Sequence, residues 1–367
     1  MSASMDLDLL RHLTSLPGLS GFERPVADFI FGRLAELGLD TRVDTIGNVT
    51  AHIPGSGPRL MLIAHMDEVG FMVRKVYQNG FLAVQRVGGA SQHALSGQLL
   101  HVWADESPLP GVVGVLPQHL AMDVLPPPLE KVYIDVGASS REEAFALGIR
   151  PGTVITHAPT FELLNKKMIC AKALDDRIGC YLLLHLAERW HNRRPECELW
   201  LAFVVQEESH LGRATLPVAR AVKPQLAIGV DATLAFDTPD LTDGQTDVAL
   251  GEGPAIKVMD HLPGTLWGFL GHEGLRSHVE DVAEKSGLPL QREIVAGLST
   301  AVAPLPFAEE GIATAALSLP LRYSHSPVEV LHMDDVVTAD NLLEALVGST
   351  WPLDRILRSS PRGRRER

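Results

Sequence analysis

The chain has 367 residues, of which 46% are hydrophobic and 21% are charged, and its formal net charge is −13. This composition is typical of a globular protein and excludes a disordered chain, while the length suggests two domains. The acidic net charge argues against a nucleic-acid-binding protein, which would present a basic face. No run approaches the roughly 18 apolar residues of a membrane-spanning helix, and residues 1–11 lack the apolar core of a secretory signal. We therefore expect neither a nucleic-acid nor a membrane partner.

The first 70 residues predict two short helices followed by strands. The hydrophobic pattern indicates amphipathic helices at 9–16 and 26–37, and a pair of strands at 41–45 and 48–53. From Arg59 the apolar runs become continuous. Continuous apolar runs of strand length are typical of a parallel sheet that helices cover on both faces.

Residues 71–164 have a different pattern. Short β-rich stretches alternate with glycine and proline turns, and the strands are expected at 80–87, 97–102, 111–116 and 131–136. The only helix that fits this segment is a short one at 140–147. Regularly spaced short strands with turn signals predict a small barrel or sandwich, so we interpret 71–164 as an inserted β-rich domain.

Long helices and buried strands alternate again from Ala173. The expected elements are helices at 177–190 and 272–286 and strands at 198–205, 225–230 and 313–319. The predicted fold is therefore α/β, with a mixed, largely parallel sheet between helices and an inserted small β-barrel. The sheet domain is discontinuous, formed by 1–70 and 165–350, and 351–367 is a C-terminal tail.

Three cysteines, Cys170, Cys180 and Cys197, occur without a CxxC spacing. An odd number of cysteines cannot all pair within one chain, so we expect reduced, mostly buried thiols. Unpaired thiols are typical of a cytoplasmic protein.

Four apolar runs are each followed by side chains that can bind a metal ion. The carboxyl ends of parallel strands meet at one edge of a sheet, where ligands bind. The residues that follow these runs are His65 with Asp67, Glu207 with Glu208, Asp231, and His325, and an acidic pair, Asp175 and Asp176, precedes a predicted helix.

Each of these residues also has an ordinary explanation. A His-x-Asp pair is common on surfaces, two adjacent glutamates often lie in a solvated loop, and an aspartate before a helix usually caps it. Independent capping and loop roles do not explain why every buried strand should end in a potential ligand. The coincidence favours a metal site.

The chemistry of a two-metal hydrolase requires such a set of side chains. Imidazole and carboxylate ligands suit Zn²⁺ and other divalent ions. Two cations roughly 3.5–4 Å apart repel, so a bridging carboxylate is needed. The nucleophile is a bridging hydroxide, which forms because metal coordination lowers the pKa of water to about 7. One acid that does not bind metal must accept its proton. Because side chains of consecutive residues at a strand end point to opposite sides, Glu207 and Glu208 can divide the roles of base and ligand.

Five segments in this order resemble the tetrahedral dinuclear aminopeptidases, the glutamyl-aminopeptidase and endoglucanase-M type family. The resemblance extends from Leu9 to about Leu346. The segments that carry it are Ala64–Phe71, Lys172–Cys180, Gln206–Glu208, Val230–Thr233 and Arg322–Pro327.

The resemblance implies a role for each candidate residue. Asp175 would bridge two divalent ions, zinc or cobalt, and Glu207 would be the general base of an aminopeptidase that cleaves the N-terminal bond of peptides. Asp67 would hydrogen-bond the ring of His65. The remaining ligands would be His65 and Asp231 on one ion and Glu208 and His325 on the other.

The resemblance also implies an assembly and a backbone feature. The inserted domain would mediate dimer contacts, and six dimers would form a hollow tetrahedron of twelve subunits. The peptide bond between Asp175 and Asp176 would be cis.

Two segments depart from the family pattern. Ser209–Ala214 stands in place of a Val-Gly-Leu-Arg-Gly-Ala-like stretch, and Ala296–Thr300 stands in place of a Gly-Gly-Thr-Asp-like one. Both are expected near the substrate, so the preferred N-terminal side chain stays open. Two other functions also remain: a non-catalytic metal-binding relative, and a glycoside hydrolase, whose two carboxyl groups would need no metal.

Overall fold

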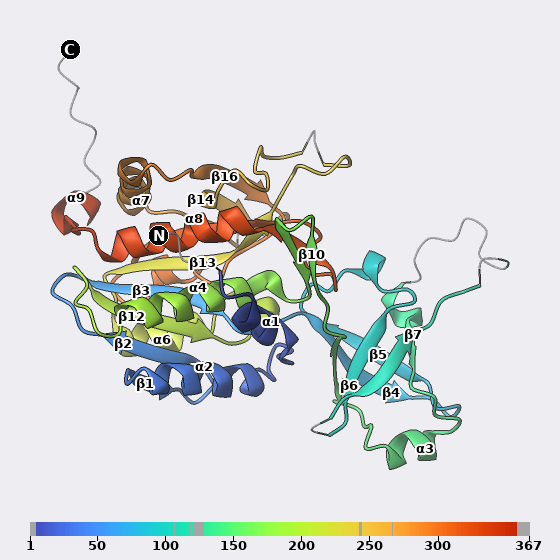
Figure 1. Cartoon of the computed structure of the whole chain (residues 1–367). Helices are drawn as coiled ribbons and strands as arrows, with labels where there is room; N and C mark the ends of the chain where they lie inside the picture. Colours follow the sequence, from blue (N-terminus) through green and yellow to red (C-terminus); the bar gives the residue numbers. More distant parts are fainter. Residues whose placement is uncertain are drawn as a thin grey trace.

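A computed structural model of the chain describes residues 5–105, 107–117, 119, 128–241, 244–265 and 267–357. Figure 1 shows an α/β body from which a β-barrel projects to one side. In the body, a nine-stranded sheet has the order β1-β2-β12-β3-β13-β17-β14-β15, with β16 paired to β14. The strands are β1 (Asp40–Val43), β2 (Val49–Ile53), β3 (Arg59–His65), β12 (Glu198–Val204), β13 (Leu226–Leu234), β14 (Ala255–His261), β15 (Gly268–Leu270), β16 (Gln291–Ala296) and β17 (Ala313–Leu321).

The four central strands, β12, β3, β13 and β17, run parallel to one another. The outer pairs β1 with β2, β2 with β12, β14 with β17 and β14 with β15 are antiparallel. The predicted mixed, mostly parallel sheet is therefore confirmed. Because the parallel strands end at the same edge, the segments that follow them are brought together there.

Helices cover both faces of this sheet. Successive residues of β3 alternate between the two faces, so Leu60 and Leu62 belong to one hydrophobic core while Met61 and Ile63 belong to another. The first core includes residues of α1 (Leu7–Ser15), α2 (Arg24–Glu36), α4 (Leu174–Trp190), α7 (Glu273–Ser286) and α8 (Met333–Val347). The second core includes α6 (Thr215–Val222) and the short 3₁₀ helix η4 (Leu305–Phe307).

The inserted barrel is closed and antiparallel, with the strand order β4-β5-β8-β7-β6-β9. It has a hydrophobic core of its own. A three-stranded sheet, β10-β11-β18, lies between the barrel and the body in Figure 1. The bounds are β4 (Gly70–Val76), β5 (Leu82–Val87), β6 (Leu99–Trp103), β7 (Leu109–Val113), β8 (Tyr133–Asp135), β9 (Val154–His157), β10 (Phe161–Leu164), β11 (Met168–Ala171), β18 (Glu329–His332), and helix α3 (Arg141–Ala146).

The segment after α8 is described as far as residue 357. Leu353–Leu357 forms α9, and Trp351 and Ile356 are buried in the first core. Residues 358–367, the rest of the predicted tail, lie outside the described residues. Among the described helices, none has the length and apolar character needed to cross a bilayer.

Buried polar contacts fix the start of α4 against the rest of the body. Arg177 is fully buried, and its Nε donates to the carbonyl of Met66 at 2.8 Å while Nη1 donates to the carbonyl of Leu16 at 3.2 Å. Lys172, which is also buried, pairs with Glu68 at 2.7 Å. These contacts join α4 to the segment that follows β3, so the two segments hold a fixed relative position.

Candidate metal centre

Three candidate ligands meet at the carboxyl end of the central strands. His65 is the last residue of β3, Asp231 lies in the neighbouring strand β13, and Asp175 lies at the irregular start of α4. His65 Nε2 is 3.2 Å from Asp175 Oδ1 and 3.7 Å from Asp231 Oδ1. Their ligand atoms lie within 4.8 Å of one another, a separation that suits one metal ion.

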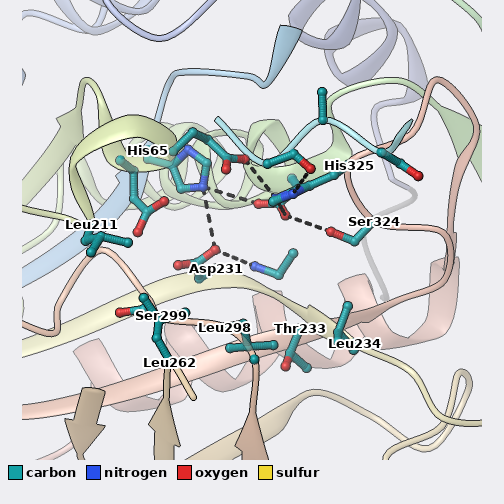
Figure 2. Close-up of a pocket in the computed structure, with 18 of the residues that line it drawn as sticks. His65, Leu211, Asp231, Thr233, Leu234, Leu262, Leu298, Ser299, Ser324 and His325 are labelled. Atoms are coloured by element: carbon teal, nitrogen blue, oxygen red, sulfur yellow. Dashed lines mark hydrogen bonds and ion pairs between the residues drawn. The ribbon is translucent and has the colours of Figure 1, made fainter. Parts of the chain in front are cut away.

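A second group shares Asp175 with the first. His325, in the loop between β17 and β18, has its Nε2 3.5 Å from Asp175 Oδ2 and 3.2 Å from Glu208 Oε1. Asp175, Glu208 and His325 also lie within 4.8 Å of one another. The two carboxylate oxygens of Asp175 therefore face different imidazoles, and Figure 2 shows both rings converging on this point.

One candidate ligand and two residues close to others have a left-handed backbone. Ala173, Gln206 and His325 have φ angles of 53°, 56° and 63°. Such values are uncommon for residues other than glycine, and they concentrate at functional sites where the surrounding structure holds them. The peptide bond between Asp175 and Asp176 is cis, as expected from the sequence.

The prediction that strand geometry separates the side chains of Glu207 and Glu208 was wrong. The two residues do not continue a strand; they begin the short helix α5 (Glu207–His210), after Gln206 turns the chain. Consecutive side chains on a helix diverge by about 100°, and this divergence separates the two carboxylates. Glu208 faces His325, whereas Glu207 Oε1 is buried without a hydrogen-bond partner among the described residues.

Asp67 organises the segment that carries both glutamates. Its two carboxylate oxygens accept hydrogen bonds from the backbone N–H groups of Glu207, at 2.9 Å, and Glu208, at 3.0 Å. Asp67 Oδ1 also lies 3.4 Å from His65 Nδ1. The sequence suggested a contact with the His65 ring, but it gave no sign that Asp67 also fixes α5.

Two further acids, for which the sequence predicted no role, hold the backbones of the candidate ligands. Glu329 is buried and accepts from the N–H groups of His325, at 2.7 Å, and Asp175, at 3.1 Å. Asp176 accepts from the N–H of His65 at 3.0 Å. In the sequence, the only indication of a role for Glu329 was that this acid interrupts the otherwise apolar run 328–331.

Burial sets the charge state of this cluster. Burial raises the pKa of Asp231 to about 7 and moves the pKa of Glu207 well above its ordinary value. For Asp175, burial also acts to raise the pKa, but the hydrogen bonds with His325 and His65 outweigh it and hold the pKa below its ordinary range. Against the effect of burial, Glu208 and Asp175 raise the pKa of His325 to about 12.

The donor set fits divalent cations. The buried carboxylates need a nearby positive charge to stay ionised, and the imidazoles supply that charge only when they are protonated. A metal ion provides that charge directly, and it binds carboxylates together with neutral imidazoles. The unpaired Oε1 of Glu207 lies beside both groups and lines the same cavity.

The candidate ligands line a cavity of about 690 Å³ between the body and the barrel. On the barrel side, Arg86 and the segment 89–93 form its wall. On the opposite side, the lining residues include four leucines: Leu211, Leu234, Leu262 and Leu298. A cavity of this size accommodates one or two residues of a peptide.

A family model of the M42 glutamyl aminopeptidases matches residues 47–342. The chain belongs to this family. It is therefore an aminopeptidase and a hydrolase, and the family resemblance found in the sequence is confirmed.

Individual aminopeptidases and a solved peptidase structure are similar to this chain over nearly its whole length. The putative aminopeptidase SgcX of Escherichia coli is 38% identical over 337 residues, which cover 90% of each chain. The lysyl aminopeptidase of Pyrococcus furiosus is 34% identical and covers 95% of this chain and 99% of its own. The TET1 peptidase of Pyrococcus horikoshii, which can assemble into a tetrahedron or a large octahedral shell, has a TM-score of 0.82 at 31% identity and covers 93% and 98% of the two chains.

The position of Glu329 in this M42 aminopeptidase predicts an effect on metal affinity. A glutamine at this position can accept only one of the two backbone N–H groups that the carboxylate holds, so Glu329→Gln should loosen both Asp175 and His325. We expect zinc affinity to fall roughly 10- to 100-fold, as for other residues that orient metal ligands. Isothermal titration of the metal-free protein with zinc measures this affinity, and the variant Glu36→Gln, which changes an exposed residue, is the control. Equal zinc affinity in the two variants would contradict the role of Glu329 in positioning Asp175 and His325.

Proposed function

We propose that this M42 aminopeptidase holds two divalent metal ions per subunit, zinc or cobalt, and that Asp175 bridges them. His65 and Asp231 complete the coordination of one ion, and Glu208 and His325 that of the other. The observation that carries this proposal is the position of Asp175, whose two oxygens face separate imidazoles at 3.2 and 3.5 Å.

The reaction is hydrolysis of the first peptide bond of a peptide. When bound, the metal ions lower the pKa of water and polarise the carbonyl group that is attacked. Glu207 accepts the proton of the attacking water and donates it to the departing amine. Its Oε1, which is buried without a hydrogen-bond partner among the described residues and lines the cavity beside both groups, supports this role.

The two other functions considered from the sequence have less support. A glycoside hydrolase needs two carboxyl groups but no imidazoles. That function would not explain why His65 and His325 both lie close to Asp175. A protein that only bound metal would not need a buried acid such as Glu207 beside both groups.

Replacement of Glu207 by glutamine tests the mechanism. We expect Glu207→Gln to lower kcat for aminoacyl-p-nitroanilides by about 10²- to 10⁴-fold, because the amide cannot accept the proton. Metal binding should persist, since Glu207 is not among the proposed ligands. The measurement is steady-state hydrolysis after removal of metal with EDTA and reconstitution with zinc or cobalt.

The exposed Glu310→Gln serves as the matched control and should retain activity. Unchanged kcat in Glu207→Gln would show that another group is the base. Activity that survives complete metal removal would exclude a two-metal reaction.

We further propose that the barrel, within residues 71–164, mediates dimer contacts and that six dimers form a tetrahedral dodecamer. Residues 1–70 and 165–350 would form the catalytic domain. The assembly of the Pyrococcus horikoshii TET1 peptidase into a tetrahedron supports this proposal. The three free cysteines suit a reducing, cytoplasmic compartment.

Sedimentation equilibrium of the purified protein tests the assembly. The expected mass is twelve times the 39.8 kDa of one chain. A second check is dilution, which should release dimers before monomers if the barrel contacts are the stronger ones. A protein that stays monomeric at micromolar concentration would contradict the proposal.

A further inference from the structure

The cavity beside the candidate ligands has two walls of different character. Leu234, Leu262 and Leu298 lie along the side opposite His65 and His325, and Leu211 lies at one end (Figure 2). All four leucines are partly exposed, so a ligand in the cavity could cover them. We call these four residues the leucine wall.

Three members of the leucine wall, Leu211, Leu262 and Leu298, lie in loops, and the fourth, Leu234, ends strand β13. Leu211 has a left-handed backbone with φ 54°, and its N–H donates to the carbonyl of Glu207 at 2.8 Å. The next residue, Gly212, has φ 70°, and a Cβ there would lie 2.3 Å from the carbonyl oxygen of Ala301. Glycine is therefore required where this loop touches the loop that carries Leu298.

Trp267 connects the segments that carry Leu211, Leu262 and Leu298. Its carbonyl accepts from the N–H of Leu262 at 3.0 Å, and its indole Nε1 donates to Ser299 Oγ at 3.2 Å. The guanidinium of Arg213 lies 5.2 Å above the centre of its ring. The two segments that depart from the family pattern, 209–214 and 296–300, are thus held together as one surface.

This surface also has a fixed position relative to a candidate ligand. The N–H of Ala301, which follows Leu298 by three residues, is 3.4 Å from Asp231 Oδ2. Asp231 and the loop that carries Leu298 therefore hold a fixed relative position.

The charges around the cavity disfavour an ionised side chain on this wall. Among the described lining residues, the carboxylates are those of Asp175, Glu207, Glu208 and Asp231, which the proposed reaction already uses. Arg86, a lining cation, is on the barrel side and donates to the carbonyl of Ala90 at 3.4 Å. A lysine or glutamate side chain on the leucine wall would lose its hydration without gaining an opposite charge.

We propose that the leucine wall selects peptides with a large apolar N-terminal residue, such as leucine, methionine or phenylalanine, and that Leu298 and Leu262 determine this specificity. This inference rests on the proposed aminopeptidase mechanism, because it places the first residue of the peptide beside Asp231. Apolar side chains gain from leaving water against such a surface.

The first experiment compares substrates on the metal-reconstituted full chain. The kcat/KM for L-leucine p-nitroanilide should exceed the values for the L-lysine and L-glutamate p-nitroanilides by about tenfold or more, given the discrimination that apolar pockets achieve. A preference for lysine or glutamate would overturn the inference and leave the proposed function standing.

The second experiment changes the wall. Leu298→Asp places a carboxylate on it, so the ratio of kcat/KM for lysine to that for leucine p-nitroanilide should rise at least about tenfold. Leu262→Asp should act in the same direction and serves if the first variant does not fold. The conservative Leu298→Met should keep the original ratio, and so should Leu270→Asp, which changes an exposed leucine outside the cavity lining. Unchanged ratios in both aspartate variants would overturn the inference.

Binding without turnover separates the inference from the mechanism. Isothermal titration of the zinc-loaded Glu207→Gln variant, in which hydrolysis of the amide is slowed, should give tighter binding of L-leucinamide than of L-lysinamide, by about tenfold or more. If no p-nitroanilide is cleaved but this difference is found, the proposed function fails while the apolar selection holds. Equal affinity, or no binding of either amide, would overturn the selection.

Discussion

The carboxylate of Asp175 lies between two groups of potential ligands, and the geometry of the site depends on that shared position. One oxygen faces His65 and the other faces His325. Two divalent cations a few ångströms apart repel each other, and a shared carboxylate is the means by which proteins hold such pairs. The same residue lies in the irregular first turn of α4, a helix that is buried on almost all sides. A displacement of this helix would therefore disturb both groups at once.

The fold holds these acids through their backbones as well as through their side chains. Asp67 binds the N–H groups of the two glutamates on α5, and Glu329 binds those of Asp175 and His325. Each of these acids connects segments that are far apart in the sequence. The parallel strands bring the segments to one edge of the sheet, and the buried acids then fix their orientation. This arrangement supplies the preorganisation that a hydrolytic site requires.

The sequence predicted the central sheet, the inserted barrel and the residues that meet at the sheet edge, because continuous apolar runs reveal buried strands. It did not predict β14 or β16. Both strands contain charged residues, Lys257 in β14 and Glu293 in β16, which are fully buried because they pair with each other at 2.8 Å. Hydropathy treats such residues as exposed. It also could not reveal the role of Glu329, since the backbone groups that this acid binds are contributed by distant segments.

Metal stoichiometry tests the central claim most directly. Equilibrium dialysis of the metal-free chain against zinc, followed by elemental analysis, should give two ions per subunit. Asp175→Asn should reduce binding at both positions, because each group loses its shared ligand, whereas Asp231→Asn should weaken only one. One zinc ion per wild-type subunit, or two ions retained with unchanged affinity in Asp175→Asn, would contradict a pair of cations bridged by Asp175.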